Sequence, residues 1–84
     1  MIVRMWEIKV HPEFVSDALS WVCDVGLPEI EALPQHVRSE VFSSADNRIV
    51  VISRWTGTPL TLGDPPRHMV ERGAHSWDFS PVDR

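Results

Sequence analysis

Cysteine, positive charge and long apolar runs are all scarce in this chain of 84 residues. The single cysteine, Cys23, excludes an internal disulfide and any metal cage built from cysteines. Because Trp21, Val22 and Val25 flank it, we expect a buried thiol that packs as a small core side chain rather than a nucleophile.

The balance of charge is acidic. Lysine and arginine number 8 against 12 aspartates and glutamates, which gives a formal net charge of -4. The basic residues are scattered singly, so we expect no nucleic-acid surface. Arg4 and Glu7 interrupt the apolar residues near the N-terminus, so we expect neither a signal peptide nor a membrane span. A cytoplasmic protein that does not bind membranes is the prediction.

The length predicts one domain over residues 1–84. A chain of this size buries roughly 60 to 65% of its unfolded surface on folding, so its core is marginal. No internal repeat, low-complexity tract or linker suggests a second unit. Association with a second copy would add the burial that such a small domain lacks.

One run of β-branched residues, Arg48 to Trp55, predicts a strand that organises the rest of the chain. The two-residue period of a strand places Ile49, Val51, Ser53 and Trp55 on one face and Val50, Ile52 and Arg54 on the other. Both faces are largely apolar and both need cover. The chain can cover one face with helices, so we expect a homodimer through the other face of the sheet, with the assignment of the faces left open.

Three further strands are predicted, at Ile2 to Val10, Val37 to Ser43 and His75 to Val82. The second joins the organising strand through a hairpin, because Asp46 and Asn47 tolerate the dihedrals of a tight turn. Pro81 indicates a sheet edge or the end of a strand.

Two helices are expected between the strands. The first has an apolar stripe at helical spacing, formed by Val15, Ala18, Leu19, Val22, Val25 or Gly26, Ile30 and Leu33. Pro28 predicts a kink or a break near Val25 to Leu27. The second is a short helix over Arg67 to Arg72, with Asp64 as its N-cap and Gly73 after its end. The order β-α-β-β-α-β predicts a ferredoxin-like α+β fold with a four-stranded antiparallel sheet.

At this point the chain resembles the dimeric α/β barrel superfamily, and within it the small proteins grouped around the antibiotic biosynthesis monooxygenases. The resemblance covers nearly the whole chain: a first strand ending Val10-His11-Pro12, a long helix ending Leu33-Pro34, the hairpin from Val37 to Trp55, and the strand ending Ile52-Ser53-Arg54-Trp55.

The resemblance implies an activity and a pocket. Members that are cofactor-free oxygenases oxidise electron-rich aromatic polyketides between the sheet and the helices, using an asparagine, a tryptophan and a tyrosine. Trp55 matches the tryptophan, Val51 stands where the asparagine would be, and the chain has no tyrosine. Haem-degrading relatives use a first-strand asparagine, a tryptophan and a histidine ligand on the second helix. Here Trp6 stands near the asparagine's place, and His68 is available as the histidine.

The residues themselves support a flat apolar slot for an aromatic ligand, walled by Trp6 and Trp55. Trp21 and Trp77 are assigned to the core or an interface, and packing alone also explains any one of the four tryptophans. His68 beside such a slot would serve as a general base or an axial ligand near neutral pH, and the alternative is a solvated helix residue with no such role. Arg54 lies among apolar neighbours, where it pairs with a carboxylate or binds an anionic group of a ligand.

Histidine spacing argues against a metal. The four histidines, His11, His36, His68 and His75, lack the short spacing of metal ligands. Arg4, like Arg54, is expected to pair with Glu7, Glu40 or the second subunit.

Two hypotheses for function follow. The first is a cofactor-independent monooxygenase that acts on a small aromatic substrate of polyketide or quinol type, with Trp55 and His68 as catalytic residues and Trp6, Val51 and Arg54 contacting the substrate. The second is a non-catalytic dimeric barrel that binds a small molecule or serves as an accessory subunit. A haem-binding protein is a third, weaker alternative.

Overall fold

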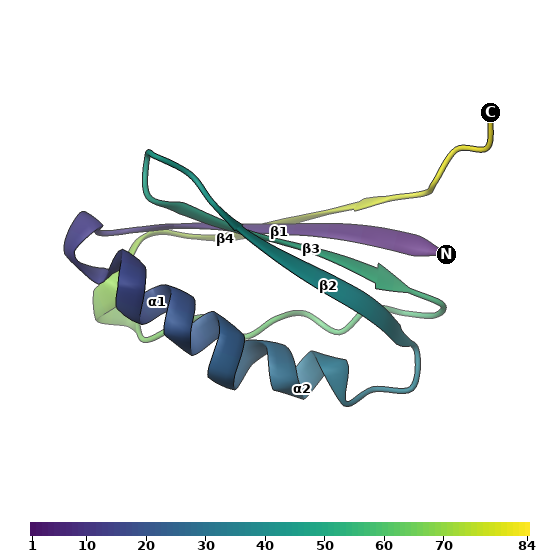
Figure 1. Ribbon diagram of the computed structural model, residues 1–84, viewed down its shortest axis with the longest axis horizontal. Helices are drawn as coiled ribbons and strands as arrows, with labels where there is room; N and C mark the ends of the chain where they lie inside the picture. The colour runs from purple at the N-terminus through teal and green to yellow at the C-terminus, as the bar shows by residue number, and fades with distance from the viewer.

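The computed structural model describes all residues, 1–84, as a four-stranded antiparallel sheet with a helical layer on one face (Figure 1). The elements in chain order are β1 (Ile2–Val10), η1 (Pro12–Phe14), α1 (Val15–Trp21), η2 (Val22–Gly26), α2 (Leu27–Glu31), β2 (His36–Ser43), β3 (Arg48–Trp55), η3 (Arg67–Met69) and β4 (Val70–Phe79). The strands lie in the order β2-β3-β1-β4. This is the strand order of the ferredoxin-like α+β fold, so the predicted fold class is confirmed.

The hairpin between β2 and β3 forms where the sequence predicted it. Asn47 has a φ of 67°, in the left-handed region that asparagine tolerates better than most residues. The Ser44 hydroxyl accepts a hydrogen bond from the Arg48 backbone N–H at 3.1 Å and donates one to Asp46. These local bonds set the register that places Val41 opposite Val51.

The irregularity predicted near Val25 to Leu27 is present, but it is a wide helical turn and the chain does not break there. The chain continues from α1 through a π-helical segment, η2, into α2. The Leu27 N–H bonds to the carbonyl of Val22, five residues back, so the turn is wider than an α-helical turn. Pro28 follows at the first turn of α2, where its missing N–H costs little.

The prediction of a helix over Arg67 to Arg72 is wrong. Only one 3₁₀ turn forms, at Arg67–Met69, and β4 begins at Val70 and ends at Phe79. Val70 pairs with Val10, and Arg72 pairs with Lys9, so the ladder to β1 outweighs the weak helical preference of these residues. The connection between β3 and η3 therefore has no regular structure, and Figure 1 shows it returning on the helical side of the sheet.

The core lies between the sheet and the helical layer. It consists of Trp6, Ile8, Val10, Ala18, Val22, Leu27, Ile30, Ile49, Val51, Trp55 and Leu62. On β3 the buried residues alternate with half-buried ones, so the face with Ile49 and Val51 meets the helices. The face with Val50 and Ile52 has no cover within the chain. None of the helices has the length and apolar character needed to cross a lipid bilayer.

Two predictions about single side chains are corrected by the structure. Cys23 is exposed rather than buried, because it lies on the outer side of η2 while Val22 and Gly26 face the core. Arg4 pairs with Asp78 on β4 rather than with Glu7 or Glu40. The predicted fourth strand begins five residues later than the real one, and its register with β1, which brings Arg4 opposite Asp78, could not be predicted.

Candidate functional site

The helical face of β1 brings two of the predicted site residues together. Trp6 lies opposite Val51 on β3 and opposite Ser76 on β4. Trp6 is 2% exposed and Val51 is 1% exposed, so both belong to the core. The indole Nε1 of Trp6 is buried and has no hydrogen-bond partner in the protein. This part of the sheet therefore has an apolar surface and one hydrogen-bond donor without an acceptor, the Trp6 indole N–H.

Trp55 is buried in the same core, but its indole N–H has a hydrogen-bond acceptor. Its Nε1 donates to the Ser53 hydroxyl at 2.8 Å, and both residues are almost completely buried. The ring of His36 meets the Trp55 ring edge to face, with centroids 5.2 Å apart. His36 is held in turn by a contact of 2.7 Å between its Nε2 and the Ser39 hydroxyl. This arrangement fixes the Trp55 indole rigidly.

The other predicted residues lie apart from Trp6. Trp55 pairs with Ile2, four residues along β1 and so about 13 Å from the Trp6 position. His68 lies on η3 beyond Val10, at the opposite end of β1, where its ring meets Phe14 edge to face with centroids 5.1 Å apart. Arg54 projects from the opposite face of the sheet and makes no ion pair. The structure thus groups Trp6 with Val51 and separates both from Trp55, His68 and Arg54.

An ion pair borders the helical face at the edge strand β4. Arg4 Nε and Nη2 donate to the two oxygens of Asp78 at 2.7 and 2.9 Å, a bidentate geometry. These hydrogen bonds from Arg4 lower the pKa of Asp78, and the bond to Asp78 raises the pKa of Arg4. Since each charge neutralises the other, the pair leaves no free cation beside Trp6.

The connection after β3 completes the helical layer with few anchors. From Thr56 to Pro66 only Leu62 and Pro65 are buried. Leu62 packs at Gly26, where an added Cβ would lie 3.1 Å from Leu62 Cδ1 and 2.9 Å from Trp21 Cζ3. Sequence reasoning missed this contact, because neither the π-helical turn nor the course of an irregular connection can be read from periodicity.

The one hollow on the surface lies elsewhere. It is an open depression of about 560 Å³, lined by Asp64, Pro65, Arg67, Val70, Glu71 and Gly73. Three of its six lining residues are charged, whereas sites for aromatic ligands are predominantly apolar. No three histidine, cysteine, aspartate or glutamate side chains gather closely enough to hold a metal ion.

The uncovered face of the sheet has an apolar part. Register places Trp77, Met5 and Ile52 in one row across the strands, next to a row with Phe79 and Val3. Val50 and Phe42 extend the same surface onto β2. We refer to these seven residues as the apolar face. Phe42, Trp77 and Phe79 are 49%, 44% and 53% exposed, so three large aromatic side chains meet solvent there.

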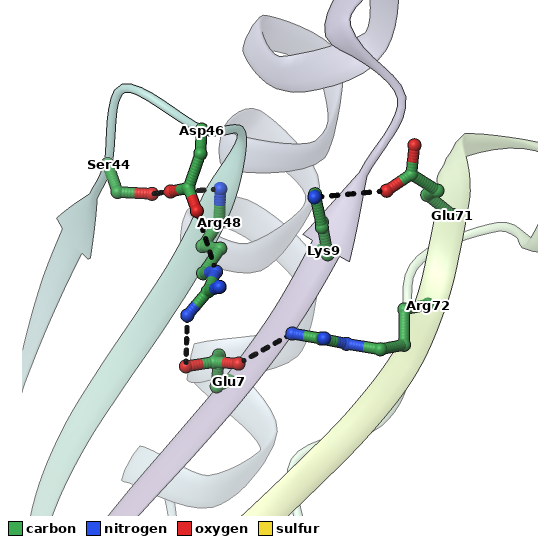
Figure 2. A network of polar contacts seen from close by, with 7 residues as sticks. All are labelled: Glu7, Lys9, Ser44, Asp46, Arg48, Glu71 and Arg72. Atoms are coloured by element: carbon green, nitrogen blue, oxygen red, sulfur yellow. Dashed lines mark hydrogen bonds and ion pairs between the residues drawn. The ribbon is translucent and has the colours of Figure 1, made fainter.

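The other end of this face carries a charge network (Figure 2). Glu7 lies between two arginines, with Arg72 Nη2 at 3.1 Å from Oε1 and Arg48 Nη1 at 3.7 Å from Oε2. Lys9 pairs with Glu71 at 3.4 Å, and Arg48 also pairs with Asp46 at 3.0 Å. The side chain of Glu7 is only 12% exposed. Three acids balance three bases, so the network is neutral and has a structural role.

Comparisons with known proteins inform the fold. No protein-family model matches the chain, and no curated protein matches it. Among solved structures, the structure of Rv0793 from Mycobacterium tuberculosis is similar, with a TM-score of 0.69 over 99% of this chain and 96% of that chain. The two sequences are 13% identical. This similarity supports the ferredoxin-like fold and carries no information about activity.

Proposed function

We propose that the protein is a homodimeric α/β barrel that binds a small aromatic molecule of polyketide or quinol type on the helical side of each sheet. The dimer is supported by the apolar face, because soluble monomers rarely leave a contiguous aromatic and aliphatic surface open to water. A two-fold axis places the same face of a second copy opposite it. The two sheets then cover each other, as the resemblance to dimeric α/β barrels implies.

The observation that carries the ligand site is the incomplete cover of β4, the strand beside Trp6, on its helical side. Trp6 is buried, yet Ser76, its neighbour on β4, is exposed on the same face. The second helix that would cover this edge is replaced by a weakly anchored connection. A flat aromatic molecule would lie against Trp6 from the β4 edge and replace part of that connection.

A second candidate function is cofactor-independent oxygenation of the same ligand. The observation that favours it is the unused indole donor of Trp6 in apolar surroundings, where a hydrogen bond to a developing oxyanion is strong. In this hypothesis His68 takes a proton from a substrate long enough to reach the end of β1, while Trp55, buried at the other end of the strand, supports the core and does not touch the substrate. If catalysis is absent, the same site defines a binding protein or an accessory subunit.

Anthrone distinguishes the two functions, because oxygen converts it to anthraquinone and water with no other reductant. Binding is measured by calorimetry with anthraquinone, and turnover by oxygen uptake with anthrone. Binding together with faster oxygen uptake would support the oxygenase. Binding with no acceleration would identify the non-catalytic protein, and no binding of either compound would contradict both.

His68→Ala is the matched variant for the oxygenase. The His68 ring meets the Phe14 ring, and the residue is exposed and lies outside the core, so the variant should fold. Loss of turnover with binding retained would assign His68 to proton removal. Unchanged turnover would remove His68 from the mechanism and leave the binding site intact.

A further inference from the structure

The Trp6 indole is the one buried tryptophan whose polar atom the fold does not use. Trp6 is 2% exposed, and its Nε1 has no acceptor in the protein. Trp55, equally buried, donates to Ser53 at 2.8 Å. Buried polar groups are almost always satisfied, and an exception in a folded protein calls for a specific explanation. The contrast between two indoles in one core shows that the fold can satisfy such a group and does not do so at Trp6.

The surroundings of Trp6 differ on its two sides. Toward β3 it meets Val51, which is buried and offers no acceptor from its side chain. Toward β4 it meets Ser76, which is exposed and makes no side-chain hydrogen bond. Trp6 itself is buried, so a ligand would reach it only by displacing its cover, and the side with a polar, solvent-exposed neighbour is the β4 edge.

The connection between β3 and η3, which lies on the helical side of the sheet (Figure 1), has few buried side chains. The connection from Thr56 to Pro66 has only Leu62 and Pro65 buried, and Leu62 rests in the notch that Gly26 leaves beside Trp21. Segments with few buried contacts open at low free energy. The connection can thus move aside for a ligand without unfolding the sheet.

The charges nearby limit what the ligand can be. Arg4, two residues from Trp6 on the same strand face, is already neutralised by Asp78 through two hydrogen bonds. No free cation remains to bind a carboxylate or a phosphate. An uncharged oxygen acceptor on an apolar ring system fits the site better than an anion.

We propose that Trp6 Nε1 donates a hydrogen bond to the carbonyl oxygen of a bound aryl ketone or quinone, which reaches it from the β4 edge. This inference rests on the proposed binding function and adds the chemical class of the ligand and the atom that recognises it. The hydrogen bond satisfies the indole only in the complex, so it favours ligands with a carbonyl over hydrocarbons of the same shape.

The test uses 1-tetralone and tetralin, which share a bicyclic skeleton and differ by one carbonyl oxygen. Neither is a Michael acceptor or an alkylating agent, so neither should form a stable adduct with the exposed Cys23. Four tryptophans give four indole N–H signals in a proton–nitrogen correlation spectrum. Adding 1-tetralone should move the Trp6 signal downfield, whereas tetralin should not, and the Trp55 signal should stay in place with both.

Affinities in Trp6→Phe complete the test as a double-mutant cycle. The ratio of tetralone to tetralin affinity should fall roughly three- to tenfold in this variant, the scale of one hydrogen bond. Ser76→Ala is the control, and it should leave both the free-state Trp6 signal and the ratio unchanged. The spectrum of the wild-type protein gives its answer even if Trp6→Phe folds poorly.

Three results would overturn the inference. If Ser76→Ala moves the Trp6 signal of the free protein, Ser76 is already the acceptor. If both compounds bind and the Trp6 signal does not move, the aromatic site stands but Trp6 is not its donor. If neither compound binds, the proposed binding function fails and the donor role fails with it.

Discussion

At the scale of single residues, the alternation of a strand predicts much but not everything. It places Ile49, Val51 and Trp55 on one face of β3, as observed. It cannot say that Trp6 lies opposite Val51 rather than Trp55, because register depends on how two strands pair across the sheet. The sequence therefore identified aromatic side chains of the right face and could not tell which of them lie together.

The hydrogen bond between Trp55 and Ser53 gives a first prediction. Ser53→Ala leaves the buried Trp55 Nε1 without an acceptor, which should lower the free energy of unfolding by about 1–3 kcal/mol. Urea denaturation followed by tryptophan fluorescence measures the change. Ser20→Ala, on a helix surface that is exposed to water, is the control and should have little effect. Equal stability of Ser53→Ala and the wild type would refute the role of this bond.

The pair formed by Arg4 and Asp78 predicts a dependence on pH. Because Arg4 lowers the folded pKa of Asp78, the pair stabilises the protein above the unfolded pKa of about 3.9, and this contribution disappears as the pH falls through the lowered folded pKa. Asp78 is 44% exposed, so solvent screens the pair and Asp78→Asn should cost only about 0.5 kcal/mol at pH 7. Denaturation at a series of pH values should show this difference shrinking toward pH 2. A difference that is constant over the whole range would contradict the assignment.

At the scale of elements, the strands β1 and β3 were predicted at their observed bounds, and β2 within one residue. In these strands the β-branched residues and the alternation of apolar and polar side chains both favour the strand that the structure shows. The predicted helix over Arg67 to Arg72 failed for a tertiary reason, and the irregularity predicted near Pro28 is a wide helical turn rather than a break. Pairing with β1 extends β4 to Val70, and the wide turn of η2 accommodates the proline.

The notch at Gly26 gives the prediction at this scale. A Cβ at Gly26 would lie 2.9 Å from the Trp21 ring and 3.1 Å from Leu62, so Gly26→Ala should destabilise the protein by about 1–3 kcal/mol through overpacking. The better helix propensity of alanine offsets up to about 1 kcal/mol of this cost. Thermal unfolding measures the balance.

Gly73→Ala is the matched control for the notch. No atom lies within 4 Å of the position of its Cβ, so this variant should be as stable as the wild type. Amide hydrogen exchange should become faster in the connection between Thr56 and Pro66 of Gly26→Ala, because the added methyl group displaces the Leu62 side chain from its contact with Gly26. Unchanged protection of that connection would show that Gly26 does not anchor it.

At the scale of the whole molecule, two layers leave one face of the sheet without cover. The sequence anticipated this from the two apolar faces of β3, and it could not decide which face the helices take. The structure gives the helices the face of Ile49 and Val51, so Val50 and Ile52 belong to the open one. Trp77 and Phe79 enlarge that open face, because β4 pairs beside β1.

Substitution in the apolar face tests what covers it. Trp77→Glu puts a charge into the apolar face on the edge strand β4, opposite Met5, and should dissociate the proposed dimer. Val25→Glu adds the same charge at a side chain on the helix that is 47% exposed, far from the sheet's open face, and should leave the dimer intact. Both variants keep their own cores, so far-ultraviolet circular dichroism should show unchanged secondary structure in each.

The most direct test of the account is the mass of the protein in solution, measured by light scattering at micromolar concentration. The account predicts twice the chain mass of 9.6 kDa for the wild type and for Val25→Glu, and a single chain for Trp77→Glu. A wild-type protein that is monomeric under these conditions would contradict the barrel. So would a Trp77→Glu variant that remains a dimer.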